Sequence, residues 1–262
     1  MKKIITSIIA VIITSILTTI EINAGYKENS ARLLKESNNN SIPEINTTDI
    51  LNNNKELKDL ASENKISTEL KGKKIAVIST DGVEELEIII PIIYLKNRGA
   101  TVEVIAPQAS EFPPNFGVKI PSIRKTHILT VNYMRNSGWL KIDKFTDNIS
   151  ASDYDAVIIP GGGWNPDALR TDAKTISFLK DMDKQKKPIA AICHGPLVLI
   201  NAGIIKNRKA TSFWSVQIDL QNAGAIVSDK DVVIDKNLIT SRFPFDLPAF
   251  LKALETELKK NK

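Results

Sequence analysis

The sequence IAAICHGPLVLI occupies residues 189–200, and the fold prediction starts from it. The apolar run from Pro188 to Ile192 is typical of a buried strand, and Gly195-Pro196 before further apolar residues is typical of a helix start. Cys193, the only cysteine in the chain, lies at the bend between them. Free N–H groups and the dipole at the start of a helix favour negative charge. We therefore predict a thiol of lowered pKa, the cysteine counterpart of the nucleophile elbow of serine hydrolases.

Composition limits the other interpretations of this residue. Free cysteine is often a small buried hydrophobe, so a structural role stays open. A single cysteine allows no disulfide within the chain. The 35 Lys and Arg exceed the 30 Asp and Glu by five, and no basic stripe interleaved with aromatic residues is present. Nucleic acid is therefore not expected as a partner.

The first 70 residues differ from the rest of the chain. Two lysines, the apolar run 4–20 and the small residues at Ala24-Gly25 predict an export signal over 1–24, for a periplasmic or secreted protein. The apolar run also has about the length of a minimal membrane span, so an uncleaved anchor is the alternative. Residues 25–70 are polar and rich in Asn, which predicts a tether without a core. Residues 71–262 have the usual size of one domain.

Strands and helices alternate through this domain. Lys74–Thr80 and Thr101–Ala106 are predicted strands, and Val83–Arg98 between them has helical spacing, so the three form a right-handed βαβ unit. Residues 108–152 are broken by prolines and predict a β-arm or a cover over the site. We predict an α/β fold with a doubly wound, mostly parallel sheet and helices on both faces. A small antiparallel addition is expected from segments 225–227, 232–235 and 238–241.

The functional groups of such a sheet gather where its strands end. The turn after the first strand and Cys193 lie on the same edge. Glu84, Glu85 and Glu87 follow that turn, and two of them are explained as acids in the first turn of a helix. We expect the third to be partly desolvated and to share a proton with the thiol or to act as an acid or base.

Gly161-Gly162-Gly163 follows the buried strand Asp155–Pro160. The glycines lack the spacing of a P-loop or a dinucleotide-binding turn. Free backbone N–H groups that approach a reacting centre and hold an oxyanion explain them better. Asp167 is explained as an acid in the first turn of the next helix, and His127 as a histidine in a loop.

Five motifs in this order resemble the PfpI family of cysteine peptidases and protein deglycases, which is related to class I glutamine amidotransferases. They lie at residues 84–91, 159–162, 190–196, 231–235 and 240–250. The resemblance implies a flavodoxin-like fold and a homo-oligomer, dimer or higher. It implies Cys193 as nucleophile, Glu87 as the carboxyl that hydrogen-bonds its sulfur, and His194 as the adjacent histidine. No metal or organic cofactor is expected.

The resemblance also implies an acid that orients His194 from a neighbouring subunit, at the position of Asp167. Backbone N–H groups near Gly162 and His194 would form the oxyanion site. Two features depart from the family pattern: the glycine turn is one residue longer than is common, and Phe213 lies where several members have tyrosine.

Taken together, the sequence predicts an exported, cysteine-dependent enzyme that acts on small reactive carbonyls or their adducts, like a glyoxalase or deglycase. The same thiol with His194 and Asp167 also suits acyl transfer, so a peptidase or amidohydrolase is the enzymatic alternative. A redox sensor or chaperone without catalysis is the alternative from another class, because a reactive thiolate oxidises readily.

Overall fold

The computed structural model describes Lys55, Leu57, Leu60, 67–108, 122–133 and 135–260. The predicted signal over 1–24 and most of the predicted tether lie outside these residues. Within them, no helix has both the length and the apolar character needed to cross a membrane.

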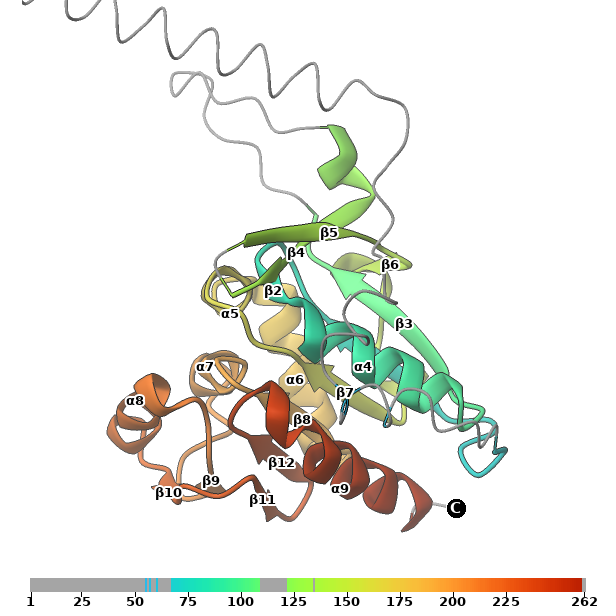
Figure 1. Ribbon diagram of the computed structural model, residues 1–262. Helices are drawn as coiled ribbons and strands as arrows, with labels where there is room; N and C mark the ends of the chain where they lie inside the picture. The colour runs from blue at the N-terminus through green and yellow to red at the C-terminus, as the bar shows by residue number, and fades with distance from the viewer. Residues whose placement is uncertain are drawn as a thin grey trace, which may run out of the picture. The chain divides into compact units, whose positions relative to one another are not determined.

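The described residues form one central sheet of seven strands and two small sheets (Figure 1). The central order is β11-β12-β8-β7-β1-β3-β6, and only β11 runs antiparallel to its neighbour. The central strands are β1 (Lys74–Ile78), β3 (Thr101–Ala106), β6 (Lys144–Phe145), β7 (Ala156–Ile159), β8 (Ile189–Ile192), β11 (Val232–Asp235) and β12 (Leu238–Ser241). The small sheets are β2 (Val83–Glu84) with β4 (His127–Asn132) and β5 (Arg135–Lys141), and β9 (Lys209–Ala210) with β10 (Ile226–Val227).

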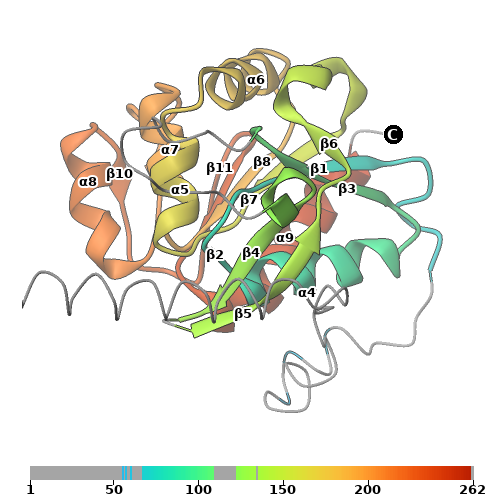
Figure 2. The same ribbon diagram turned by 90° about the horizontal axis from the view of Figure 1, so that it is seen from above.

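Helices cover both faces of the central sheet (Figure 2). One layer contains α4 (Glu85–Lys96) and α9 (Leu247–Lys260). The other contains α5 (Trp164–Leu169), α6 (Ala173–Lys184), α7 (Pro196–Asn201) and α8 (Gln217–Asn222). Short 3-10 turns are η2 (Ser122–Lys125), η3 (Thr146–Asn148), η4 (Ala151–Asp153), η5 (Trp214–Val216) and η6 (Pro244–Asp246). This arrangement confirms the predicted doubly wound α/β fold.

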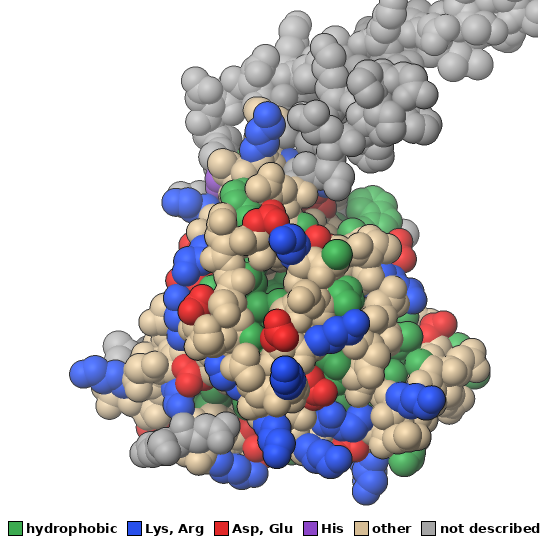
Figure 3. Space-filling view, turned by 180° about the vertical axis from the view of Figure 1, so that it is seen from behind, with side chains coloured by type: hydrophobic (Ala, Val, Ile, Leu, Met, Phe, Trp, Pro, Cys, Tyr) green, Lys and Arg blue, Asp and Glu red, His purple; other side chains and the backbone are tan. Residues whose placement is uncertain are grey.

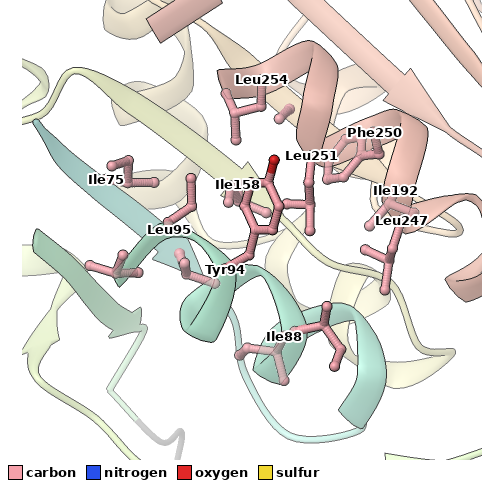
Figure 4. Packing of buried hydrophobic residues seen from close by; sticks show 14 of the residues in the cluster. Ile75, Ile88, Tyr94, Leu95, Ile158, Ile192, Leu247, Phe250, Leu251 and Leu254 are labelled. Carbon is pink, nitrogen blue, oxygen red and sulfur yellow. The ribbon is translucent and has the colours of Figure 1, made fainter. Parts of the chain in front are cut away.

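The core lies in two layers, one on each face of the sheet, because side chains alternate along each strand. Successive side chains of a strand point to opposite faces. In β1, Ile75 and Val77 therefore pack with α4 and α9 (Figure 4), whereas Ala76 and Ile78 pack with α6 and α7. All four are fully buried, which is why this strand reads as a continuous apolar run.

Three predicted details are wrong. Val83–Glu84 is not helical, because these residues pair with Thr130 and Val131 of β4. The segment around Ile226 pairs in parallel with β9 rather than adding to an antiparallel sheet. Leu57 and Leu70, from the predicted tether, are buried in the α4–α9 layer, so the packed unit takes residues from before 71.

A buried polar cluster joins α4 to α9. The Tyr94 hydroxyl donates to Glu255 Oε2 at 2.6 Å, and Lys259 Nζ donates to Oε1 at 2.6 Å. Arg98 Nε lies 3.5 Å from Oε2, and its guanidinium stacks 3.4 Å from the centre of the Tyr94 ring. Figure 4 shows Tyr94 pointing from α4 toward α9. Burial alone would raise the pKa of Glu255, but hydrogen bonds from Lys259 and Tyr94 outweigh it and lower the pKa to about 2.

Glu255→Gln is expected to lower the free energy of unfolding at pH 7 by about 3 kcal/mol, because it leaves buried positive charge unpaired. The folded pKa is below the ordinary 4.5, so the stabilisation is complete above 4.5 and is lost as the pH falls toward about 2. Urea unfolding at pH 7 measures the loss of stability. Comparison with pH 3 measures the pH dependence, because the wild type should lose more stability between pH 7 and pH 3 than the variant, which has no carboxyl at this position. Glu257→Gln, which breaks an exposed pair with Lys260 on the same helix, is the control, with a cost below about 0.5 kcal/mol. Equal losses in the two variants would contradict the prediction.

The surface opposite to the view of Figure 1 mixes both signs of charge. Lys and Arg side chains gather along its lower edge, with Asp and Glu between and above them (Figure 3). A mixed surface of this kind gives no strong single-sign field for steering a ligand.

Candidate active site

Cys193 lies at the turn between β8 and α7. Its φ of 62° is in the left-handed region, which is uncommon for a residue with a side chain. Both backbone groups are held: its N–H donates to the Ser241 carbonyl at 3.1 Å, and its carbonyl accepts from the Phe213 N–H at 3.0 Å. A Cβ at Gly195 would lie 2.4 Å from the Ile159 carbonyl oxygen, so only glycine lets α7 begin this close to β7. The predicted elbow is present.

Glu87 reaches the same point from the first turn of α4. Its side chain is completely buried, and Oε2 accepts the Gly161 N–H at 2.7 Å. The carboxyl and the Cys193 side chain face the same point, because a Cβ at Gly161 would lie 2.7 Å from Glu87 Oε2 and 2.6 Å from the Cys193 Cβ, and Oε1 has no hydrogen-bond partner among the described residues. Burial raises the pKa of Glu87 to about 8, and the charge of Glu84 adds to this rise. Glu87 is therefore mostly protonated at neutral pH.

The surroundings of Cys193 raise the pKa of its thiol well above the ordinary value. Burial is the largest cause, followed by the negative charge of Glu87, while backbone N–H groups of Gly162 and His194 oppose the rise. The prediction of a lowered pKa is therefore wrong. It counted the start of the following helix, but α7 has only six residues and Cys193 is only 6% exposed.

Glu87 and Cys193 titrate as a pair, because each changes the charge that the other experiences. When Glu87 holds its proton, its charge no longer opposes ionisation of the thiol. A protonated carboxyl donates a hydrogen bond, and a thiolate accepts one. Because the carboxyl pKa of about 8 lies below the raised pKa of the thiol, the first proton of the pair leaves Glu87, and the thiolate forms when the thiol passes its proton to that carboxylate.

The glycine turn after β7 provides the donors that face the sulfur. The N–H groups of Gly162 and His194 both donate toward Cys193. A Cβ at Gly161 would lie 2.6 Å from the Cys193 Cβ and 2.7 Å from Glu87 Oε2. Gly162 has a φ of 86°, and a Cβ there would lie 2.1 Å from the carbonyl oxygen of Gly82. Gly161 and Gly162 must therefore be glycine, because neighbouring atoms lie too close to leave room for a Cβ at either position.

Sequence reasoning missed Asn165, which holds this turn in place. The side chain is fully buried in α5, and its Nδ2 donates to the carbonyls of Pro160 and Gly161 at 2.9 and 3.0 Å. Its Oδ1 accepts from Thr80 N–H at 2.7 Å and from the Ser79 hydroxyl at 3.2 Å. Asn165 therefore ties the ends of β1 and β7 together. An asparagine two residues after a glycine turn was the available signal.

His194 lies beside the nucleophile on its outer side. Its Nδ1 is 3.2 Å from the Cys193 sulfur, and its ring stacks on Phe213 with 4.7 Å between ring centres. Burial lowers the pKa of the imidazole, so the ring is neutral at pH 7. The predicted Cys193, Glu87, His194 and Gly162 are thus brought together in one chain.

The DJ-1/PfpI family model matches residues 73–257. The chain belongs to the DJ-1/PfpI family. This match spans the elbow, the glycine turn and the start of α4, and it confirms the resemblance that the sequence motifs indicate.

Individual relatives agree with this assignment. Protein/nucleic acid deglycase 2 of Escherichia coli is 38% identical over 179 residues, which cover 68% of this chain and 93% of the relative. YraA of Bacillus subtilis, provisionally named a cysteine protease, is 39% identical over 179 residues, with 68% and 94% covered. The solved structure of Drosophila melanogaster DJ-1beta has a TM-score of 0.60 and 29% identity, with 72% of this chain and 92% of that chain covered.

Asp167 of this DJ-1/PfpI chain lies apart from the cluster. It is exposed in the first turn of α5. Among the described residues, no hydrogen bond joins it to His194. A single chain therefore does not assemble the predicted Cys–His–Asp arrangement. The role of Asp167 across a subunit contact stays a prediction.

The predicted β-arm covers the other two acids, Glu84 at the end of β2 and Glu85 at the start of α4. Glu84 Oε2 accepts the Tyr133 N–H at 3.0 Å, and the Ser137 hydroxyl donates to Glu85. Both carboxylates are more than nine-tenths buried, so they are not the solvated first-turn acids that the sequence suggests. Burial raises the pKa of Glu84 to about 7, helped by the charge of Glu85. His127 begins β4 and contacts the Thr126 hydroxyl at 2.8 Å, away from these groups.

Glu84→Gln is expected to move the first ionisation of the Glu87–Cys193 pair to lower pH. The charge of Glu84 raises the pKa of Glu87, and removing it stabilises the singly charged pair wherever that charge lies. The amide oxygen still accepts the Tyr133 N–H. Iodoacetamide alkylation of Cys193 as a function of pH measures the midpoint. The wild-type and variant curves should differ most above pH 7, where Glu84 is ionised, and coincident curves would disprove the coupling.

Proposed function

We propose that this protein is a cysteine-dependent enzyme that acts on 2-oxoaldehydes or their adducts with amines and thiols, in the manner of a glyoxalase or deglycase. The observation that carries the proposal is the juxtaposition of the buried Glu87 carboxyl and the Cys193 side chain around Gly161, with the carboxyl pKa raised to about 8 by burial. A proton donor and a nucleophile are thereby joined in one water-poor site. The Escherichia coli relative named a deglycase supports the same reaction class.

The first step is addition of the Cys193 sulfur to the aldehyde carbon. The carbon–sulfur bond forms, and the electron pair of the carbonyl bond moves to oxygen. In the singly ionised pair, the Glu87 carboxylate takes the thiol proton as this bond forms and passes it to that oxygen, which leaves a neutral hemithioacetal and a carboxylate. The N–H groups of Gly162 and His194 that face the sulfur stabilise negative charge on this side of the site.

The second step transfers a proton between adjacent carbons. The Glu87 carboxylate removes the proton from the former aldehyde carbon and returns it to the neighbouring carbon, while the hydroxyl proton moves to the second oxygen. The product is a thioester of a 2-hydroxy acid. Water then adds to the thioester and the carbon–sulfur bond breaks, which restores the thiol and releases the acid. One water is consumed in each cycle.

Methylglyoxal is the test substrate. Purified protein without added thiol should convert it to lactate, and the reaction in D₂O should place deuterium on the second carbon through exchange at Glu87. Lactate formation that persists in Glu87→Gln would contradict the carboxyl transfer. Absence of lactate would contradict the proposed substrate class.

Peptide or amide hydrolysis is the second candidate, favoured by the 3.2 Å contact between His194 Nδ1 and the sulfur. Expulsion of an amine requires a proton that His194 is placed to supply. A fluorogenic peptide separates the two functions. His194→Ala should abolish peptide hydrolysis but lower lactate formation only about tenfold, because Glu87 carries the carbonyl chemistry.

We also propose that the protein is exported and forms a homo-oligomer. The support is the sequence of residues 1–24 for export and the exposed Asp167 for a contact between subunits. Intact mass of the mature protein should correspond to a start at Gly25, whereas the full-length mass would indicate an uncleaved anchor. Light scattering should give at least twice the mass of one chain, and a monomer would contradict the oligomer.

A further inference from the structure

A stack of three rings begins at the catalytic elbow. The His194 ring packs on Phe213 with 4.7 Å between centres and 29° between planes. The opposite side of Phe213 contacts Trp214, with 3.7 Å between centres. Trp214 is 67% exposed, whereas Phe213 is half-buried against the α4–α9 core. Phe213 is therefore the middle ring, held from both sides.

The backbone of Phe213 is tied to the same elbow. Its N–H donates to the carbonyl of Cys193 at 3.0 Å, which fixes the backbone of Phe213 relative to the nucleophile. Immediately after Cys193, the His194 ring places Nδ1 3.2 Å from the sulfur. The structure gives the imidazole no other ring contact among the described residues.

We propose that Phe213 is a positioning residue that fixes the plane of the His194 imidazole beside the Cys193 sulfur. A flat aromatic surface restricts rotation of the imidazole about its Cβ–Cγ bond, which an aliphatic side chain of similar size does not. This role requires the ring and not a hydroxyl. It explains how Phe213 functions at a position where the family resemblance suggests tyrosine. The inference deepens the proposed function and rests on it for its kinetic test only.

The first test observes His194 without substrate. The chain has two histidines, so His127→Gln assigns both in nitrogen-15 and carbon-13 spectra. In Phe213→Leu, which keeps the volume but removes the flat ring, the His194 nitrogen shifts should move from one tautomer toward a mixture. In Phe213→Ala, water reaches the ring, and the His194 midpoint should rise toward the ordinary value of about 6.5. Burial lowers the pKa of His194 in the wild type, so exposing the ring to water should raise that pKa.

Two variants provide the controls for the spectra. Phe213→Tyr keeps the stacking surface and should reproduce the wild-type His194 signals. Phe245→Ala removes a 51% exposed aromatic residue that does not contact His194, and it should also leave them unchanged. Unchanged His194 signals in Phe213→Leu would overturn the inference, as would a Phe213→Tyr variant that behaves like Phe213→Leu. Phe213→Leu decides the matter even where Phe213→Ala does not fold.

The second test is a double-mutant cycle on kcat for methylglyoxal. Phe213→Leu should lower kcat by up to about tenfold and leave KM nearly unchanged. This loss of kcat should not exceed that of His194→Ala. In the His194→Ala background, Phe213→Leu should have no further effect within about twofold, because Phe213 acts through His194. Full additivity would overturn the inference. Failure of methylglyoxal as a substrate would leave the spectroscopic result intact, so the two proposals fail separately.

Discussion

Gly161→Ala is expected to lower turnover of methylglyoxal by at least about 100-fold, the effect of a displacement near 1 Å at a reacting centre. The added methyl carbon would lie 2.6 Å from the Cys193 Cβ, 2.7 Å from Glu87 Oε2 and 2.9 Å from the His194 nitrogen. Two of these atoms belong to the Cys193 elbow, a Cβ and a backbone nitrogen, and the third, Glu87 Oε2, is held by the Gly161 N–H. The nucleophile, the carboxyl and the elbow backbone must therefore separate, and the hydrogen bond from Gly161 N–H to Glu87 is strained.

The same substitution two residues later is the matched control. Gly163 has a φ of −75°, and a Cβ there has no heavy atom within 4 Å. Gly163→Ala should keep turnover within about twofold, because surface changes without new contacts have small effects. Overpacking at Gly161 should also cost about 1–3 kcal/mol of stability, measured by urea unfolding. Similar turnover in the two variants would show that the 161 turn does not position the site.

Cys193→Ser is expected to reduce lactate formation by about 10⁴-fold or more, in the range seen when a nucleophile is removed from an enzyme. The oxygen replaces sulfur with little change in shape, but a hydroxyl is a weak nucleophile unless a base activates it. Glu87 is mostly protonated below a pKa of about 8, and its carboxylate is far too weak a base to deprotonate a hydroxyl as it does a thiol. Turnover at the level of the uncatalysed reaction is the expected result.

The stability of Cys193→Ser separates chemistry from folding. The backbone bonds of residue 193 to Ser241 and Phe213 do not depend on the side chain. Circular dichroism and the urea midpoint should therefore remain close to those of the wild type. A folded serine variant that retains a tenth of the activity would remove the sulfur from the mechanism, and with it the proposed function.

The fold was predictable where local sequence and tertiary environment demand the same residues. In β1, each side chain is buried on one of two faces, so every position is apolar whichever layer it joins. The Cys193 elbow was predictable because a strand, a small residue and Gly-Pro leave few other geometries. Residues 83–84 were misassigned because their partner, β4, is some 45 residues distant in sequence and decides their conformation.

The site was predictable as a set of groups but not in its energetics. Glu87 and Gly162 were expected near the sulfur, and both lie there. The buried states of Glu84 and Glu85 depend on Tyr133 and Ser137 from the β-arm, which no local pattern of α4 indicates. Asn165 looks like an ordinary residue in a helix start, and only the approach of β1 reveals that it bridges two strand ends.

The amino-acid sequence by itself determines the order of strands and helices, the doubly wound class and the position of Cys193 at a chain reversal. These features depend on backbone preference and apolar periodicity, which act over a few neighbouring residues. Tertiary structure alone decided how the proton is divided between Glu87 and Cys193. That division depends on burial and on charges from separate elements, and electrostatic forces in a dry interior act between groups that are remote in sequence.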